Sequence, residues 1–536
     1  MLSGQHQLVR TAFVRAVGLL YGLAFLAALR QNEALLGPEG LLPATAALDR
    51  AAQLPLQPWQ RWLQLPTLFW LVTPTNAALS IVAALGLGFS YAIVVCGAAN
   101  APTMACLWFL YLSIVNLGQA WYGFGWDSAL LELGFLSMLL VPTLRYKRCE
   151  PAHPPPPICV WGFRWFLTRV LLTRALLTLR SSCWRDASAC AAELQLDQLP
   201  ATPAGWHVHG SAPHWLLACF VVFVLGAQLL APVLMLLGRT ARCWAGIAAA
   251  LALLIGGGGP VGARSEGFAA AAACVWCFDD AHLSWLFGER DVEAAIAAAG
   301  RQQRSARGAG RWVRRLAHAA ALYAVARSSW DVVSRDARLP SNSAQSTRCD
   351  IALNTFLWTR CHVSAHARIT ASLCSLLRRA LPLAALRVVG SYAAVQTRTG
   401  QRMEIVLSAA GDDDAQWHEL DFRCKGSSSY SAHPWLVHLA AKLLDPAQKG
   451  VARALVVSRP PNSEPPLPPL RRVKADLYRY RFVASAADGT EQAGGDDAGA
   501  VSEGGAWVRE YARPYMPPVT AGSAALERFL ELHGLG

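Results

Sequence analysis

The chain has 536 residues, enough for two or three domains, and 54% of them are apolar while 15% are charged. The formal net charge of +13 would suit a nucleic-acid partner. However, the arginines stand at the ends of apolar runs and in segment 301–315, as expected for basic flanks of membrane helices. We therefore expect a lipid bilayer as the partner and no nucleic acid.

The N-terminal part of the chain alternates apolar runs with short polar links. The first run follows Arg15, reaches Leu29 and predicts a retained membrane span or signal anchor. After a polar loop at 30–66, further runs approach the ~20 residues that a helix needs to cross a bilayer. These runs predict spans two, three and four at residues 77–97, 104–121 and 127–144.

An aromatic corner joins spans three and four. Residues 121–126 read WYGFGW, with rings that favour the membrane–water interface. Gly123 and Gly125 let the backbone reverse direction there. The corner predicts a tight helical hairpin.

Five further spans are expected after a basic, proline-rich link. Span five is amphipathic and carries four arginines, and spans eight and nine are weak. The count is thus eight or nine transmembrane helices, with spans five to nine at residues 161–180, 214–237, 244–258, 265–279 and 312–328.

The charged links set the expected orientation. A cytosolic N-terminus places the three most basic links, 145–150, 238–243 and 288–315, on the cytosolic side. Nine spans then leave the C-terminal region in the lumen. If only one of spans eight and nine exists, that region faces the cytosol and the protein is a cytosol-facing scaffold.

From about residue 385 the pattern changes to strands. Four segments alternate apolar and polar residues, and a helical segment at 433–446 interrupts them. We expect a mainly α multipass bundle followed by a small, β-rich, sandwich-like domain. The division is a transmembrane domain at 1–280, a basic cytosolic loop with the last candidate helix at 281–330, a linker at 331–384, and the luminal domain at 385–520.

Two carboxylates in span four are the first candidate functional groups. A carboxylate inside a membrane is costly and is usually paired or functional. Asp127 stands where it could cap the helix. Glu132 is a turn deeper and could pair with Arg169 or Arg174 of span five, or accept from Asn116 or Gln119. We favour structural pairing over proton handling.

Histidines and cysteines give weaker signals. A loop holding His207, His209 and His214 has metal-ligand residue types, but a surface loop is the better interpretation, so we expect no metal or cofactor. Cys183 and Cys190 could form a disulfide in an oxidising lumen. Cys274 and Cys277 have redox-motif spacing but lie in an apolar run. No catalytic motif occurs, and we expect a protein that is not an enzyme.

Aromatic residues in the C-terminal strands are candidates for partner binding, because aromatic side chains anchor many interfaces. Packing in the domain core is the alternative for each of them. The candidates are Trp417, Tyr478, Tyr480, Trp507, Tyr511 and Tyr515.

Several ordered blocks resemble the lipase maturation factor family. They are WYGFGWDSALLELGFL from Trp121, the segments 161–186 and 389–426, LYRYRF at 477–482 and WVREYARPYMPP at 507–518. The resemblance implies a multipass protein of the endoplasmic reticulum membrane that helps secreted lipases fold and assemble, with a luminal domain that engages the client. One family block that follows the equivalent of Gly426 is absent here.

A second hypothesis stays open beside this one. The helical part distantly resembles membrane oxidoreductase and carboxylase bundles. Under this hypothesis, Glu132 and the span-five arginines would serve a membrane-embedded enzyme or a transporter.

Overall fold

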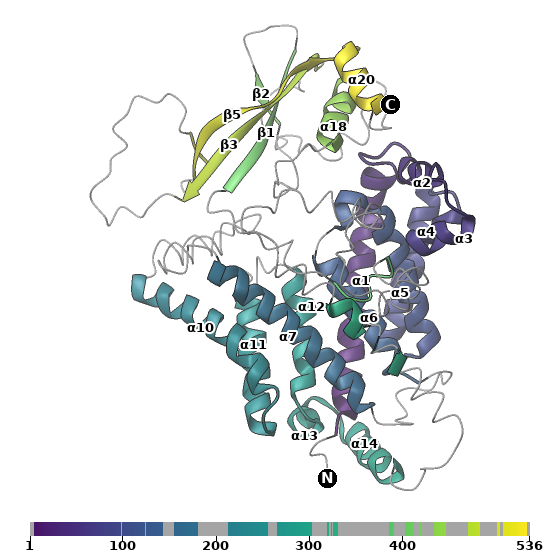
Figure 1. Cartoon of the computed structure of the whole chain (residues 1–536), viewed down its shortest axis with the longest axis vertical. Helices are drawn as coiled ribbons and strands as arrows, with labels where there is room; N and C mark the ends of the chain where they lie inside the picture. The colour runs from purple at the N-terminus through teal and green to yellow at the C-terminus, as the bar shows by residue number, and fades with distance from the viewer. Residues whose placement is uncertain are drawn as a thin grey trace, which may run out of the picture.

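A computed structural model shows a helical bundle with a smaller sheet domain at one end (Figure 1). The structure describes residues 5–97, 99–123, 125–142, 155–180, 213–255, 265–302, 319–320, 323, 325–330, 385–390, 402–411, 417–420, 434–445, 470–482, 501–503 and 507–532.

The bundle contains a helix at each of the first eight expected spans. Their bounds are α1 Gln7–Leu36, α4 Asn76–Val94, α5 Ala101–Leu117, α6 Gly125–Met138, α7 Pro157–Arg180, α10 His214–Leu234, α11 Arg239–Ile255 and α12 Ser265–Ala273, which continues into the 3-10 turn η4 Cys274–Cys277. Shorter helices lie between and after them: α2 Ala44–Ala52, α3 Pro58–Gln64, α13 Asp280–Leu283 and α14 Glu289–Gln302.

Local capping explains where two of these helices begin. The Thr75 hydroxyl accepts the Ala78 N–H at the start of α4, and the Asn100 side chain accepts the Thr103 N–H at the start of α5. Each satisfies an amide that has no partner within its helix.

Helix α1 is the central element of the bundle and contacts α4, α5, α6 and α12. Phe13 packs edge-on against Phe163, which stacks on Trp276 at 5.0 Å between ring centroids. Further along α1, Tyr21 packs edge-on against Tyr111 of α5. These ring contacts join α1 to α7 and η4 near its start and to α5 further along.

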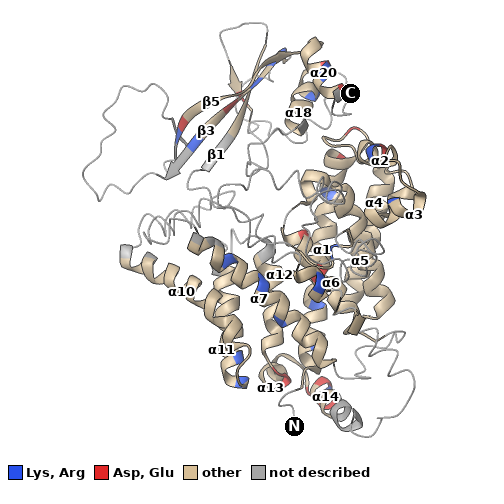
Figure 2. Cartoon of the chain, viewed as in Figure 1, with Lys and Arg blue, Asp and Glu red and all other residues tan. Residues whose placement is uncertain are grey.

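The number of membrane spans is still a prediction. By length and composition, two described helices, α1 and α4, can cross a bilayer. Other apolar stretches, such as Ala101–Leu117 and Ala218–Leu234, are 10–17 residues long, and α12 has 9 residues. The expected ninth span falls largely outside the described residues, although Val325 packs into the bundle core. Figure 2 shows that charged residues are sparse along the helices of the bundle.

The C-terminal domain contains one antiparallel sheet in the order β2-β1-β3-β5-β4. Its three long strands lie side by side with β3 in the middle, paired with β1 on one edge and β5 on the other, although these strands are far apart in the sequence. The strands are β1 Arg402–Ala410, β2 His418–Glu419, β3 Arg472–Phe482, β4 Val501–Glu503 and β5 Trp507–Thr520.

The expected sandwich is wrong for the part of this domain that the structure describes. The strands form a single sheet, and its apolar face packs on α18 Pro434–Leu444 and α20 Ala524–Leu532. Strand alternation predicts a face that must be covered, but it does not say whether a sheet or a helix covers it. The segment at 433–446 is thus the second layer and not an interruption.

Candidate functional site

A buried polar centre links α5, α6 and α7. Asp127, in the first turn of α6, accepts a hydrogen bond of 2.5 Å from the Tyr111 hydroxyl of α5. Glu132 forms an ion pair with Arg169 of α7, and both side chains are buried. The sequence offered four partners for Glu132, and the structure brings it to Arg169. No pattern in the sequence indicated that Tyr111 would bind Asp127.

Two other arginines of α7 are also buried. Arg164 donates from Nε to the Trp276 carbonyl at 3.1 Å, near the N-terminal end of the bundle. Arg174 lies five residues beyond Arg169 and is 5% exposed. The buried arginines of this helix therefore lie at successive positions along the bundle and do not form a single site.

A turn from the C-terminal half of the chain reaches the polar centre. The Gly390 N–H donates to Glu132 Oε2 at 3.0 Å, and Arg169 Nη1 donates to the Gly390 carbonyl at 3.2 Å. Nearby, Arg387 donates to Asn116 Oδ1 of α5 at 3.2 Å. The expected luminal domain thus begins inside the bundle core, which sequence spacing did not reveal.

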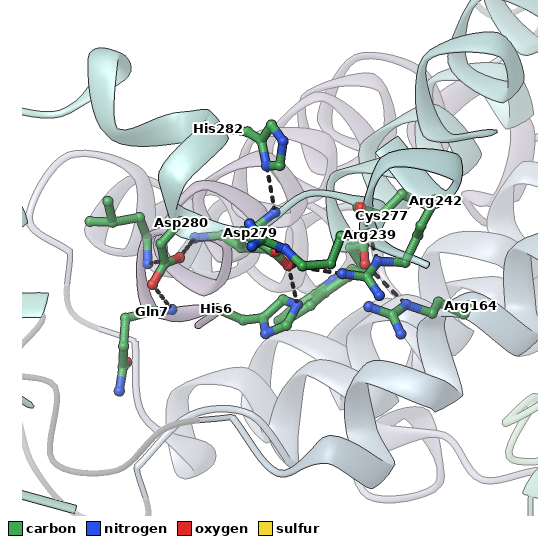
Figure 3. A network of polar contacts seen from close by, with 12 residues as sticks. His6, Gln7, Arg164, Arg239, Arg242, Cys277, Asp279, Asp280 and His282 are labelled. Carbon is green, nitrogen blue, oxygen red and sulfur yellow. Dashed lines mark hydrogen bonds and ion pairs between the residues drawn. The ribbon is translucent and has the colours of Figure 1, made fainter. Parts of the chain in front are cut away.

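At the N-terminal end of the bundle, Asp280 binds the start of α1 (Figure 3). Its carboxylate accepts from the backbone N–H groups of Gln7, Leu8 and Val9 at 2.7, 2.8 and 3.1 Å. Burial raises the pKa of Asp280, and these three hydrogen bonds oppose the rise. A residue distant in sequence therefore caps the first helix.

The neighbouring Asp279 pairs with two arginines in the first turn of α11. Arg239 and Arg242 donate to its two carboxylate oxygens at 2.5 and 3.0 Å (Figure 3). Burial would raise the pKa of Asp279, but the bond from Arg239 and the charge of Arg242 lower it. His6 Nε2 lies 3.4 Å away, and burial lowers the His6 pKa to about 4, so this imidazole is neutral at pH 7.

Three of the expected partner-binding aromatics come together on the sheet face that points away from α18 and α20. Tyr478 and Tyr511 pack edge-on at 5.7 Å, and Arg509 stacks over Tyr478 at 5.0 Å. Beside them, the Lys474 ammonium lies 5.0 Å from the Trp417 ring. We call these residues, together with Glu419, which forms a bidentate pair with Arg509, the aromatic face.

The other aromatic candidates differ in position. Tyr515 packs against the core between the sheet and its helices. Tyr480 and Trp507 belong to β3 and β5, but their side chains are outside the described part of the structure. The core-packing alternative therefore applies to Tyr515, whereas Tyr511 is 49% exposed.

The sheet domain meets the bundle beside the aromatic corner. His438 of α18 donates from Nδ1 to the Leu41 carbonyl at 2.8 Å. Trp435 packs on Trp121 with ring centroids 5.1 Å apart. The domain therefore sits at the end of the bundle where α1 finishes and α5 turns into α6 (Figure 1).

The structure describes neither the candidate metal site nor the candidate disulfide. His207, His209, Cys183 and Cys190 lie outside the described residues. Among the residues that are described, no cluster of three His, Cys, Asp or Glu could hold a metal ion. Cys274 and Cys277 are both buried and are free thiols.

Comparison with known proteins assigns the family. Residues 8–284 match the family model for the lipase maturation factor transmembrane domain. Human (Homo sapiens) Lipase maturation factor 1 is 30% identical over 97% of this chain and 89% of its own length. Mouse (Mus musculus) Lipase maturation factor 1 is 29% identical over 96% of this chain and 88% of its own length.

A second group of relatives matches a shorter region. Lipase maturation factor 2 from chicken (Gallus gallus) is 30% identical over 42% of this chain and 32% of its own length. No solved structure matches the chain. The family match, together with near full-length similarity to the first group, shows that the chain belongs to the lipase maturation factor family.

Proposed function

We propose that this protein is a multipass factor of the endoplasmic reticulum membrane that assists the folding, assembly and secretion of lipases. The bundle is its anchor, and the C-terminal domain at 385–520 holds the client in the lumen without catalysing a reaction. The observation that carries this proposal is the similarity to lipase maturation factors over nearly the whole chain. Those relatives are named for lipase maturation and not for an enzymatic reaction.

The aromatic face supports a holding role for the C-terminal domain. Tyr and Arg are enriched at protein interfaces, where an aromatic ring buries a large area and Arg forms planar hydrogen bonds. Here Tyr511 is 49% exposed beside Arg509. The face therefore offers a client the exposed Tyr511 ring, beside an Arg509 that is held by Glu419.

The position of this domain supports a luminal orientation. The N-terminus, the α10–α11 link and α14 lie at one end of the bundle, and the sheet domain lies at the other (Figure 1). The first end carries Arg239 and Arg242, whose side chains flank apolar helices. Under the positive-inside rule that end faces the cytosol, which leaves the sheet domain in the lumen.

The polar centre supports a structural role over an enzyme or transporter. Glu132 is bound by Arg169 and by a backbone amide of the same chain. A group that relays protons or substrate needs access to water or ligand, but Glu132 is 0% exposed. The alternative function thus lacks an accessible carboxylate at this position.

Point variants of the sheet test the holding role in cells that lack this gene and express a secreted lipase. We expect Tyr511→Ala to lower secreted lipase activity at constant lipase mRNA, because the exposed ring is lost. Glu510→Ala is the matched control: its side chain is 50% exposed, and it is adjacent on β5 but points to the opposite side of the strand. Equal lipase activity for Tyr511→Ala and wild type would reject the aromatic face as the contact surface.

Truncation and glycosylation test the remaining parts of the proposal. A chain ending after Gly400 keeps the turn at 385–390, so it should stay in the membrane yet lose lipase maturation. A glycosylation acceptor placed near Ser341 should be modified if the region is luminal. Full lipase activity from the truncated chain would move the function to the bundle, and an unmodified acceptor would reject the luminal orientation.

A further inference from the structure

Residues 385–390 form a turn that is packed into the helical bundle. Val388 is 1% exposed and belongs to the bundle core, and Ala385 is 6% exposed. Arg387 has a backbone φ of 48°, the left-handed region that non-glycine residues rarely adopt. A strained residue persists only where surrounding contacts hold it, so the bundle fixes this turn.

The contacts that hold the turn involve mainly its backbone. At one end, the Asn116 side chain donates to the Ala385 carbonyl at 3.3 Å and accepts from Arg387. At the other end, Gly390 donates its N–H to Glu132 and accepts from Arg169 through its carbonyl. Helices α5, α6 and α7 each contribute one of these side chains.

The Glu132–Arg169 pair is chemically suited to a peptide group. A carboxylate only accepts and a guanidinium only donates, so the pair offers both functions side by side. Gly390 presents the complementary N–H and carbonyl of one residue. In a buried site, an amide or carbonyl without such a partner would cost free energy, and here each partner satisfies the other.

We propose that Asn116, Glu132 and Arg169 form an intrachain docking site whose ligand is the peptide backbone of residues 385–390. This site fixes the beginning of the C-terminal domain to the middle of the bundle. In the part of the chain that the structure describes, the domain contacts the bundle at this turn and where α18 meets Leu41. These contacts lie within the chain and do not depend on a role in lipase maturation.

Hydrogen exchange on the full-length protein in detergent tests the site. In wild type, peptides that cover 385–390 should exchange slowly, because the Gly390 amide is bonded and buried. Glu132→Gln removes the charge of the pair and should speed their exchange on the order of tenfold or more. Ser137→Ala is the matched control, since Ser137 is buried on the same helix and its hydroxyl donates to Leu133.

A second variant changes the turn and leaves the helices as they are. Arg387→Ala removes the bond to Asn116 and should also speed exchange at 385–390, while α1 and α5 stay protected. If Glu132→Gln loosens α1 and α5 as well, the result for Arg387→Ala decides. Unchanged exchange at 385–390 in Arg387→Ala, or equal acceleration in Ser137→Ala, would overturn the docking site.

Discussion

The bundle is held by different kinds of contact at its N-terminal end and near its middle. At the N-terminal end, the Asp279 and Asp280 carboxylates are 1% and 0% exposed, but Arg239, one of the arginines that bind Asp279, is 46% exposed. Near the middle, Glu132 and Arg169 are 0% and 3% exposed and bind a turn from residues 385–390. The first site pairs buried carboxylates with backbone amides and with an arginine that reaches water, and the second is a pair in which both partners are buried.

The difference shows where a lost contact costs most. An arginine that reaches water stays solvated when its partner is removed, so such a pair contributes less. Water cannot solvate a buried charge that has lost its partner, so the loss costs more. The polar centre should therefore be the less tolerant of the two sites, although the N-terminal end has more ion pairs.

The largest effect is expected from breaking the buried pair. Glu132→Ala leaves Arg169 and the Gly390 amide without this acceptor, which should destabilise the bundle by about 3–5 kcal/mol. Thermal unfolding in detergent and steady-state abundance both measure this change. Glu132→Gln should lower abundance more than Asp127→Asn. Wild-type abundance for both variants would contradict the comparison.

A double variant sharpens the same point. Glu132→Leu combined with Arg169→Met removes both charges, so no uncompensated ion remains in the core. The double variant should unfold at a higher temperature than Arg169→Met or Glu132→Leu alone. Additive losses would mean that the two residues act independently.

The next largest effect is expected at Asp280. Asp280→Ala leaves three N–H groups at the start of α1 without their acceptor, at a cost of about 2–3 kcal/mol. Asp280→Asn keeps a side-chain oxygen there and should cost less. A melting temperature equal to wild type in Asp280→Ala would show that water caps this helix equally well.

A smaller, pH-dependent effect is expected at His6. Its folded pKa of about 4 is below the usual 6.5, so the unfolded chain takes up a proton first as pH falls. His6 therefore reduces stability progressively as the pH falls from about 6.5 to about 4.

Comparing His6→Gln with wild type isolates this histidine from its neighbours. The raised pKa of Asp280 acts in the opposite direction, and it is present in both proteins. Melting temperatures should converge as pH rises above 6.5, and the variant should lose less stability at pH 4–5. Parallel pH profiles would place the His6 pKa near its ordinary value.

The smallest effect is expected on the sheet. Arg509 and Glu419 form a bidentate pair in which the Arg509 side chain is 10% exposed and the Glu419 side chain 41% exposed. Arg509→Ala leaves a carboxylate that water can solvate, so it should cost about 1 kcal/mol of stability, less than Glu132→Ala. A loss as large as that for Glu132→Ala would contradict the distinction between surface and buried pairs.

The sequence predicted the elements far better than their long-range contacts. Apolar runs predicted helices near the observed bounds, because this signal is local. A carboxylate in an apolar run also predicted a buried partner for Glu132, and Arg169 was one of the two arginines expected. Neither Gly390 nor Tyr111 could be named, since no local pattern marks which distant group fills a buried site.

The N-terminal site was missed for the same physical reason. Asp279 and Asp280 follow the apolar segment that ends at Cys277, which by itself predicts only a polar link. Their partners lie at residues 6–9 and 239–242, so the pairing arises from how the helices pack. The packing of a helix on the sheet was missed for the same reason. Periodicity at 433–446 predicts a helix, but it does not indicate which surface that helix packs on.

The Asp280 contact also bears on the order in which the protein is completed. Asp280 follows Gln7 by 273 residues, and a ribosome adds about 5–20 residues per second. The first helix therefore leaves the ribosome on the order of tens of seconds before its cap has been synthesised. During that interval its amides must be satisfied by water or by a chaperone, and α1 can take its final place only after residue 280 has emerged. A ribosome that stalls between these two points would leave a membrane helix whose start has no carboxylate to bind.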